Sequence, residues 1–412
     1  MQVGYVQLFK TQPAFFIFSV FSIFFSAPGQ TFLISLAIPL LCNTNQISPL
    51  TFAGLYASST LCASFALPLI GRLIDRKPIQ WIILLNAGAF STAMILIAVS
   101  NHPPILWIGL CLARLFGQGA LPLSATAHTI KRFTIHRGRA LSLTQLGYPL
   151  SESIFPIIFL GLLSTTNVTV TYFIFALFIP IIYIPLSLLH VKNKDSNVNG
   201  TTQKTNPCNQ THASSSQALK DPLLPIYLTI SAIPPIIMTA AFYFQMNLFN
   251  QNNWDVYHIA NAILCYAILK LIATLMIGPV IDKIGVPLPL IFITLILGIA
   301  TSLIVFKQTV LTAYIYYGLF GIGIGAAATT MSSLWGLLYG SKAIGEIKGI
   351  IAIVRNGGTA VSPLLFSWLH NSVGIRLTHL FLISGMIILG IATLPMILKK
   401  IDPRLSPAIS TD

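Results

Sequence analysis

Four charged residues lie inside long apolar stretches of the sequence, namely Arg114, Glu152, Lys270 and Arg355. A charge near the centre of a bilayer costs at least about 2.5–3.5 kcal/mol, so each one needs a partner, a watery cavity or a function. Three of the four are cations. Unless Glu152 neutralises more than one of them, the set keeps a positive excess that a carboxylate or similar anion would complement. These residues therefore predict a binding site for a small anion, and structural pairing is the alternative.

Further polar residues are candidates for the lining of this site. The stretch APGQT interrupts regular helix at its proline and glycine and is predicted to expose Gln30. Tyr148 stands one helical turn before Glu152 and is expected to join the site. Arg114 and Glu152 are candidates for a facing pair, in which Glu152 carries a proton that is coupled to substrate movement. A purely structural pair is the alternative for these two residues.

Another group of scarce charges lies in the stretch GRLIDRKP at residues 71–78, in a chain in which only 8% of the residues are charged. A related stretch, GPVIDKIG, follows 207 residues later at residues 278–285. In the same register, SESIFPIIF corresponds to GTAVSPLLF. Several matches in one register indicate an internal duplication.

The elements that must position these residues are helices of membrane-spanning length. Hydrophobic side chains make up 55% of the 412 residues. They come in blocks of about 20, the length that about 30 Å of hydrocarbon requires, without the alternation of strands. We predict an all-α integral membrane protein with twelve transmembrane helices, at residues 14–40, 50–70, 79–100, 105–130, 140–163, 169–190, 223–250, 257–278, 287–306, 310–335, 348–369 and 377–398.

The formal net charge of +14 suggests a nucleic-acid binder, but that function requires basic residues gathered on one solvated surface. Here they lie between the apolar blocks. With the N-terminus inside, only Lys307 and Arg376 among the loop cations fall on the outer side, which satisfies the positive-inside rule. We therefore expect both termini in the cytoplasm, a multi-pass protein of the cell (inner) membrane, the lipid bilayer as a partner, and no nucleic acid.

A long polar segment at residues 191–222 separates two sets of six apolar blocks. Its composition is typical of a flexible cytoplasmic linker. We predict an N-terminal six-helix bundle at 1–190, a pseudo-repeated C-terminal bundle at 223–398 and a cytoplasmic tail at 399–412. Parallel repeats of this kind bind their substrate between the halves, near the midplane of the bilayer.

These motifs together resemble the major facilitator superfamily. Its loop after the second helix resembles G-x-x-x-D-[RK]-x-G-[RK]-[RK], and Pro78 here replaces the second glycine. LARLFGQGA is similar to the Arg-bearing fourth helix of the family. KRFTIHRGRALSL and GEIKGIIAIVRNGGTAVSPLLF are most similar to the branch that contains monocarboxylate transporters and oxalate/formate exchangers. The loop matches, which the resemblance identifies as a gating motif, are Gly71, Asp75 and Arg76 in the first copy and Gly278, Asp282 and Lys283 in the second.

The resemblance implies roles for both groups of charges. Such loops hold two helix ends together until transport parts them, and an exposed ion pair of about 0–1 kcal/mol is weak enough to break in every cycle. A plain basic cytoplasmic turn is the alternative. In the oxalate/formate branch, basic residues of helices eight and eleven bind substrate carboxylates, which assigns Lys270 and Arg355 to the substrate. Lys270 lies one turn from the corresponding position, which Thr274 occupies here.

We therefore expect a monomeric secondary active transporter that moves a small mono- or dicarboxylate by alternating access, driven by proton symport or anion exchange. The sequence contains no G-x-x-x-x-G-K-[ST] loop and no metal-ligand spacing, so we expect no cofactor and no metal. It also lacks the catalytic constellations of a membrane enzyme, and a channel fits the paired loop motifs less well. The alternative cargo is an amino acid, another zwitterion or a drug-like molecule, with Glu152 binding the amine.

Overall fold

The computed structural model of the protein describes residues 4–133, 136–192, 215–243, 254, 256–306, 309–362 and 385. Every regular element within these ranges is a helix, as the composition predicts. The tail at 399–412 and, apart from Gly385, the predicted span at 377–398 lie outside the described residues. Most of the predicted linker lies outside them too.

Short connections separate the described helices that precede the linker. In chain order they are α1 (Tyr5–Thr11), α2 (Pro13–Phe24), η1 (Ala27–Gly29), α3 (Thr31–Asn45), α4 (Pro49–Arg76), α5 (Ile79–Ala98), α6 (Pro103–Leu112), η2 (Ala113–Ala120), α7 (Leu121–Arg132), α8 (Arg137–Gln145), α9 (Gly147–Thr165), α10 (Val168–Phe178), η3 (Ile179–Tyr183) and α11 (Ile184–Lys192). After it follow α12 (Ser215–Leu219), α13 (Leu224–Tyr243), α15 (Val256–Ile284), α16 (Pro287–Phe306), α17 (Val310–Tyr339) and helical residues 344–362.

Eight helices in the described part of the chain are long and apolar enough to cross a membrane. They coincide with the first six predicted spans and with those at 257–278 and 310–335. Two shorter apolar helices, Leu224–Thr239 and Pro287–Leu303, lie where two more spans are predicted. The prediction of helices long and apolar enough to span a membrane is therefore confirmed for the eight longer segments.

Local sequence explains where the long helix α4 begins and ends. The Ser48 side chain accepts a hydrogen bond from the backbone N–H of Thr51, which caps the first turn, and Pro49 occupies the first helical position. At the other end α4 stops at Arg76, because Lys77 precedes Pro78 and takes up an extended conformation. The motif GRLIDRKP thus spans the last turns of α4 and ends at Pro78, the residue before the next helix.

The described chain forms two compact units, and the linker is not the only boundary between them. Unit 1 comprises residues within Met1–Phe133, Leu143–Ser216 and Tyr339–Ile353. Unit 2 comprises residues within Thr134–Ser142, Gln217–Leu338 and Val354–Asp412. One short segment that precedes the linker therefore belongs to unit 2, and one that follows it belongs to unit 1.

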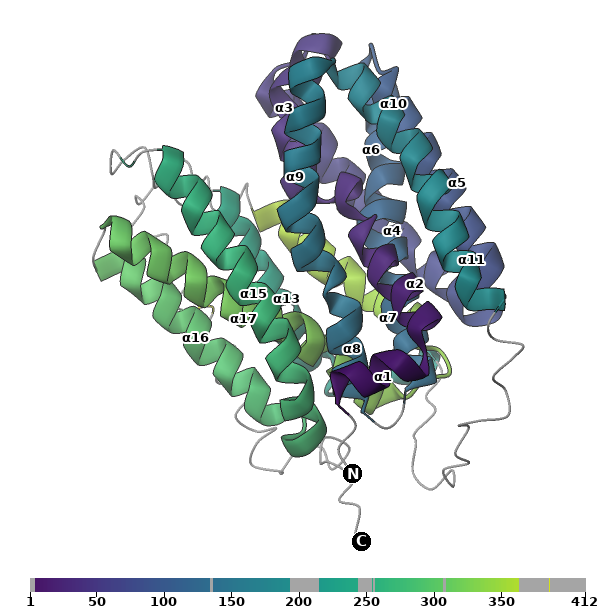
Figure 1. Cartoon of the computed structure of the whole chain (residues 1–412), viewed down its shortest axis with the longest axis vertical. Helices are drawn as coiled ribbons and strands as arrows, with labels where there is room; N and C mark the ends of the chain where they lie inside the picture. Colours follow the sequence, from purple (N-terminus) through teal and green to yellow (C-terminus); the bar gives the residue numbers. More distant parts are fainter. Residues whose placement is uncertain are drawn as a thin grey trace, which may run out of the picture. The chain divides into compact units, whose positions relative to one another are not determined.

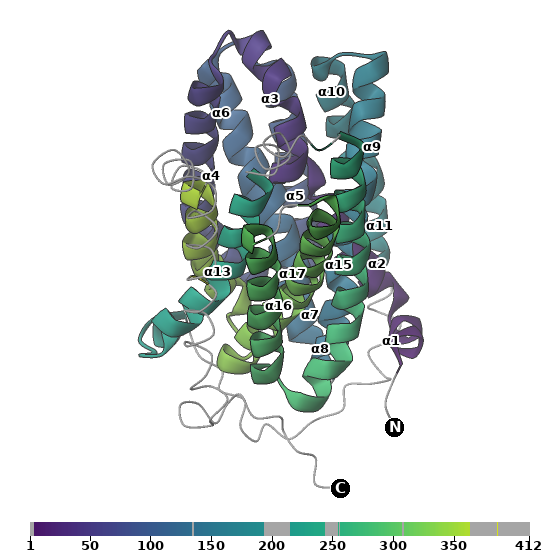
Figure 2. The same cartoon turned by 90° about the vertical axis from the view of Figure 1, so that its left-hand side faces the viewer.

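Within each unit the helices pack along their lengths. In unit 1, α5 contacts α6 and α10, while α2 contacts α7, α9 and α11 (Figure 1). In unit 2, α15, α16 and α17 run side by side (Figure 2). The backbone of α17 approaches α15 closely at Gly325, where an added Cβ would lie 2.5 Å from the carbonyl oxygen of Lys270. The glycines of α17 thus permit close packing, as expected for membrane helices.

Candidate functional site

Arg114 is a buried cation of unit 1 and is held by neutral groups. It lies in η2, a π-helical stretch in the fourth membrane span, and is 3% exposed. Its Nε donates to Thr60 Oγ1 at 3.0 Å, and its Nη1 donates to the carbonyl oxygen of Gly29 at 3.1 Å and to Thr31 Oγ1 at 3.3 Å. No described residue accepts a hydrogen bond from Nη2. The guanidinium therefore keeps a donor for another group.

Tyr56 orients this guanidinium from a third side. Its ring centroid lies 4.7 Å from Cζ of Arg114, a cation–π distance, and its hydroxyl donates to Thr31 Oγ1 at 2.8 Å. Tyr56 and Thr60 are one turn apart on α4 and so share a helix face. The sequence analysis missed both residues. Their helical spacing was the available signal, but it does not indicate which residue they contact.

The break in the first membrane span supplies the carbonyl that Arg114 binds. Helix α2 ends at Phe24, residues Ala27–Gly29 form a 3-10 turn, and α3 begins at Thr31, which confirms the predicted interruption. Because that interruption removes the usual helical partner, the Gly29 carbonyl is available to the guanidinium. Gly29 also packs against η2, and a Cβ there would lie 2.8 Å from Cα of Gly117. Gln30 is half-buried and donates to Ser26 Oγ at 3.1 Å.

Glu152 does not pair with Arg114 in the described structure. The hydrogen bonds of Arg114 go to Thr60, Thr31 and Gly29, so the predicted contact between the two charged groups is replaced by contacts with neutral oxygens. Glu152 and Tyr148 lie one turn apart on α9, and both are half-buried. Tyr148 and Glu152 thus lie close together on α9, as their spacing predicts. The Arg114 guanidinium is instead held by residues of α4 and η1.

The two other helical cations lie in unit 2 and differ in burial. Lys270 of α15 is 4% exposed, and its Nζ lies 5.3 Å from the ring centroid of Tyr266, one turn earlier on the same helix. Arg355 is exposed on the surface of the chain, and its Nε donates to Oδ1 of the buried Asn356 at 3.3 Å. Lys270 is thus the more buried of these two cations, which fits a role inside the membrane span better than Arg355 does.

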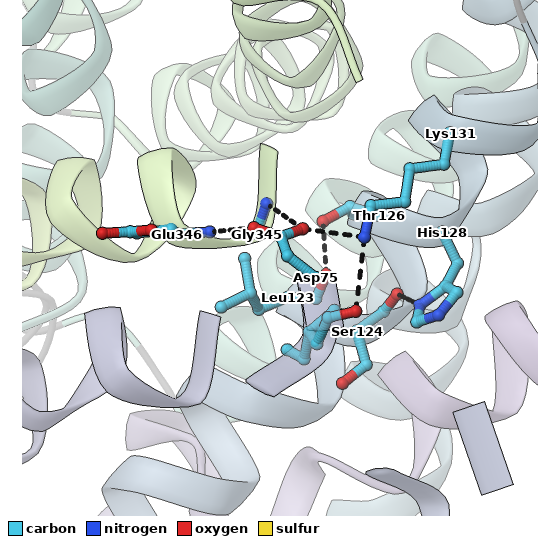
Figure 3. Close-up of polar contacts among 9 residues, drawn as sticks. Asp75, Leu123, Ser124, Thr126, His128, Lys131, Gly345 and Glu346 are labelled. Atoms are coloured by element: carbon cyan, nitrogen blue, oxygen red, sulfur yellow. Dashed lines mark hydrogen bonds and ion pairs between the residues drawn. The ribbon is translucent and has the colours of Figure 1, made fainter. Parts of the chain in front are cut away.

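Asp75 is the centre of a charged cluster in unit 1, the Asp75 cluster (Figure 3). Its carboxylate accepts hydrogen bonds from the backbone N–H groups of Gly345 at 3.0 Å and Glu346 at 2.8 Å, and Lys131 Nζ lies 2.7 Å away. Arg72 Nε, also in the cluster, pairs with Glu346 Oε1 at 2.6 Å. Asp75 therefore caps the first turn of the helix at 344–362, where the helix dipole favours a negative charge.

Asp282 is the centre of a second cluster, in unit 2. Its carboxylate accepts hydrogen bonds from the backbone N–H groups of Gly138 at 2.7 Å and Arg139 at 3.2 Å, at the first turn of α8. The Arg139 Nε lies 3.8 Å from the same carboxylate, and its Nη1 donates to His136 Nδ1 at 3.1 Å. These four residues, Asp282, Gly138, Arg139 and His136, form the Asp282 cluster. Its capping bonds repeat those of Asp75 in the 207-residue register.

The remaining predicted loop residues occupy defined places in these clusters. Arg76 and Lys283 are exposed in the last turns of α4 and α15, where a basic residue complements the helix dipole. Gly71 approaches the backbone of Gly345, so that a Cβ at Gly345 would lie 2.7 Å from the carbonyl oxygen of Gly71. Gly278 lies likewise near Gly138. Both glycine pairs let the capping carboxylates approach a helix start.

Replacing Gly71 by Ala is expected to destabilise the protein by about 1–3 kcal/mol, because the new methyl group overlaps the Gly345 backbone. Gly88 on α5 has no neighbouring atom within 4 Å of an added Cβ and provides the control, where Gly88→Ala should be neutral or stabilising. Thermal unfolding of the detergent-purified variants measures the difference. Equal stability of the two variants would contradict the close approach.

Groups of three or more His, Cys, Asp or Glu side chains suited to a metal ion are absent from the described part of the chain. The arrangement instead offers a buried guanidinium in unit 1 and a buried ammonium in unit 2. Such groups bind and orient anions through charge-assisted hydrogen bonds.

Comparison with known proteins gives a family and a fold. The family model described as Major Facilitator Superfamily matches residues 20–252 and, in a second match, residues 228–411. No curated protein sequence matches the chain.

Two solved structures share the fold. One is the human organic anion transporter MFSD10 (TETRAN), with 11% sequence identity, a TM-score of 0.70, and coverage of 93% of this chain and 99% of that chain. The other is a bacterial homologue of the iron transporter ferroportin in an outward-facing state, with 13% identity and a TM-score of 0.71. That match covers 92% of this chain and 98% of that chain. At these identities the likeness concerns the fold.

Proposed function

This chain belongs to the major facilitator superfamily of secondary transporters, and we propose that its cargo is a small organic anion. It is an all-helical, multi-pass membrane protein with the fold of that family, and it is not an enzyme. Beyond these points, we propose mono- or dicarboxylate transport by alternating access, driven by proton symport or anion exchange. The proposal includes a monomer in the cell (inner) membrane, with both termini in the cytoplasm.

The observation that carries the proposal is the environment of Arg114. A guanidinium stays charged in proteins, and burying a charge without a counter-charge is costly. Here the hydroxyls of Thr60 and Thr31, the Gly29 carbonyl and the Tyr56 ring orient Arg114 without neutralising it. A carboxylate that binds Nη2 would supply the missing negative charge. An anion therefore gains more from this site than a neutral cargo does.

Lys270 supports the same class of cargo. It is a second buried cation in a membrane span, and we propose that it binds a carboxylate oxygen, with Arg355 as a further substrate cation. Tyr148 and Gln30 are proposed to line the site, and Glu152 to carry the coupled proton. The resemblance to the monocarboxylate and oxalate/formate branch stays a prediction. MFSD10 is an organic anion transporter by its own description, which is compatible with this class of cargo.

The two Asp clusters are proposed to act as the gating elements of the transport cycle. Each uses a carboxylate to cap the start of a helix, through two backbone hydrogen bonds that can break and reform without covalent change. The gating role of Arg76 and Lys283 is proposed as part of the same loops.

Uptake by proteoliposomes tests the cargo directly. Labelled pyruvate and oxalate are expected to accumulate in vesicles that contain the protein, and labelled amino acids are not. Accumulation of amino acids without either carboxylate would replace the anion proposal by the zwitterion alternative, in which Glu152 binds the amine.

Replacing Lys270 and Arg355 together by Gln is expected to lower carboxylate uptake by about tenfold or more, because each loses a charge-assisted bond to the substrate. Lys220→Gln controls for the change in net charge, since Lys220 is exposed at the end of α12. Initial rates at several substrate concentrations measure the effect. Unchanged carboxylate uptake in the double variant would exclude these two residues from the anion site.

A further inference from the structure

The two Asp clusters share one plan but differ in the residues around the carboxylate. The capping residues correspond in the 207-residue register, Gly138 with Gly345 and Arg139 with Glu346. In the Asp75 cluster a lysine, Lys131, pairs with the carboxylate at 2.7 Å. The Asp282 cluster instead contains a histidine that holds the arginine side chain. Of the two clusters as defined above, only the Asp282 cluster contains a histidine, the side chain whose usual pKa lies between pH 5 and 8.

His136 occupies an unusual backbone position at the start of α8. Its φ angle is 57°, in the left-handed region, and its carbonyl oxygen accepts the Ala140 N–H at 3.0 Å. His136 is therefore the residue immediately before α8, and the two N–H groups that Asp282 caps follow in the first turn. A change at His136 acts directly on the turn that presents Gly138 and Arg139.

The bond between Arg139 and His136 requires an unprotonated ring nitrogen. Arg139 Nη1 can only donate, so Nδ1 of His136 must accept with a free lone pair. A proton on Nδ1 would place two donors against each other and bring two cations together. The charged side chains that act on His136 are Arg139 on α8, which repels an imidazolium, and Asp282 on α15, which attracts it.

We propose that His136 is a proton-binding site whose occupation loosens the Asp282 cluster, while the Asp75 cluster is insensitive to the same change in pH. A proton at Nδ1 removes the bond that holds Arg139, and it disturbs the first turn of α8 that donates to Asp282. The proton comes from the surrounding solution, and its binding to His136 does not require a transported cargo. The inference therefore stands apart from the proposed anion transport.

The direction of the effect follows from the pKa of His136. Burial lowers this pKa below its usual value of 6.5; Asp282 opposes the shift and Arg139 adds to it. A folded arrangement that lowers the pKa of a histidine favours its neutral form. The stabilising contribution of that histidine is fully present at pH values above the usual pKa. The contribution is lost as the pH falls through the usual pKa toward the lowered one. Acidification from about pH 7.5 to below 6 should therefore weaken the cluster.

Hydrogen exchange of backbone amides measures this, because the amides of Gly138 and Arg139 are themselves the bonds to Asp282. The experiment uses the full-length protein in detergent without substrate, and it corrects for the intrinsic pH dependence of exchange. We expect the protection of these two amides to fall several-fold between pH 7.5 and 5.5. The amides of Gly345 and Glu346 are the internal control and should keep their protection.

Two variants of His136 separate the proton from other causes. Asn tolerates the left-handed backbone and offers a carbonyl acceptor that does not titrate, so His136→Asn should keep protection at both pH values. His136→Gly keeps the backbone freedom without the acceptor and should show low protection at both. A fall in protection that persists in His136→Asn, or one that is equal at the Asp75 cluster, would overturn the proposal. Such a result would leave the transport proposal untouched.

Discussion

Replacing Arg114 by Gln is expected to lower carboxylate uptake by about 10- to 100-fold, the equivalent of losing a charge-assisted hydrogen bond of about 1.5–3 kcal/mol. The physical reason is the placement of the guanidinium. It is buried in a membrane span, and its described partners, including Thr60 and Gly29, are neutral. Under the proposed function, the cargo supplies the counter-charge. Uptake rates in proteoliposomes measure the loss.

Binding measured by thermal unfolding separates this role from a structural one. A ligand that binds the folded protein stabilises it by about 2.7 kcal/mol at one hundred times its Kd. Carboxylate should therefore raise the Tm of the wild-type protein and leave that of Arg114→Gln unchanged. Thr60→Ser keeps the hydroxyl that accepts from Nε and should bind carboxylate as the wild type does. An undiminished Tm shift in Arg114→Gln would refute the role of Arg114 in anion binding.

Replacing Asp75 by Asn is expected to lower the free energy of unfolding by about 1.5–3 kcal/mol, more than Asp282→Asn does. Asn keeps one acceptor oxygen but turns an amide donor toward the other backbone N–H, and it leaves Lys131 without its ion pair at 2.7 Å. Asp282 loses less, because the Arg139 Nε lies 3.8 Å away, beyond hydrogen-bond distance. Thermal unfolding of both variants in one detergent compares the two costs.

Amide hydrogen exchange shows in which cluster each variant loses its backbone hydrogen bonds. Asp75→Asn should increase exchange at Gly345 and Glu346, and Asp282→Asn at Gly138 and Arg139. Arg76→Gln removes an exposed charge from the same loop and should change stability by less than about 0.5 kcal/mol. A larger loss of stability in Asp282→Asn than in Asp75→Asn would contradict the difference in ion pairing.

The helices of this protein follow directly from its sequence. Apolar blocks of membrane-spanning length predict them, and the structure confirms them from α2 through α17 within the described residues. The interruption at Pro28 and Gly29 was also predicted, and the cap that Ser48 forms before Pro49 follows the same local chemistry. These features are local, because the side chains and the backbone groups they satisfy lie within one turn of each other.

The sequence did not predict the contact partners of the charged residues. The duplicated motif contains both capping carboxylates, Asp75 and Asp282, at the same position of the repeat. It did not indicate that Asp75 caps a helix some 270 residues later in the chain, or that Lys131 completes the cluster. The pairing expected for Arg114 was with Glu152, whereas the fold surrounds it with neutral groups.

The sequence by itself therefore determined the apolar environment of this protein, its helices and the repeat of its loop motif. Hydrophobicity, helical length and register are properties of segments, and they act without reference to distant residues. Only the tertiary structure decided which charges meet. It assigned residues 339–353 to unit 1 and residues 134–142 to unit 2, and it placed Tyr56 and Thr60 beside Arg114. Ion pairs and caps depend on distances of a few ångströms between helices, which only packing sets.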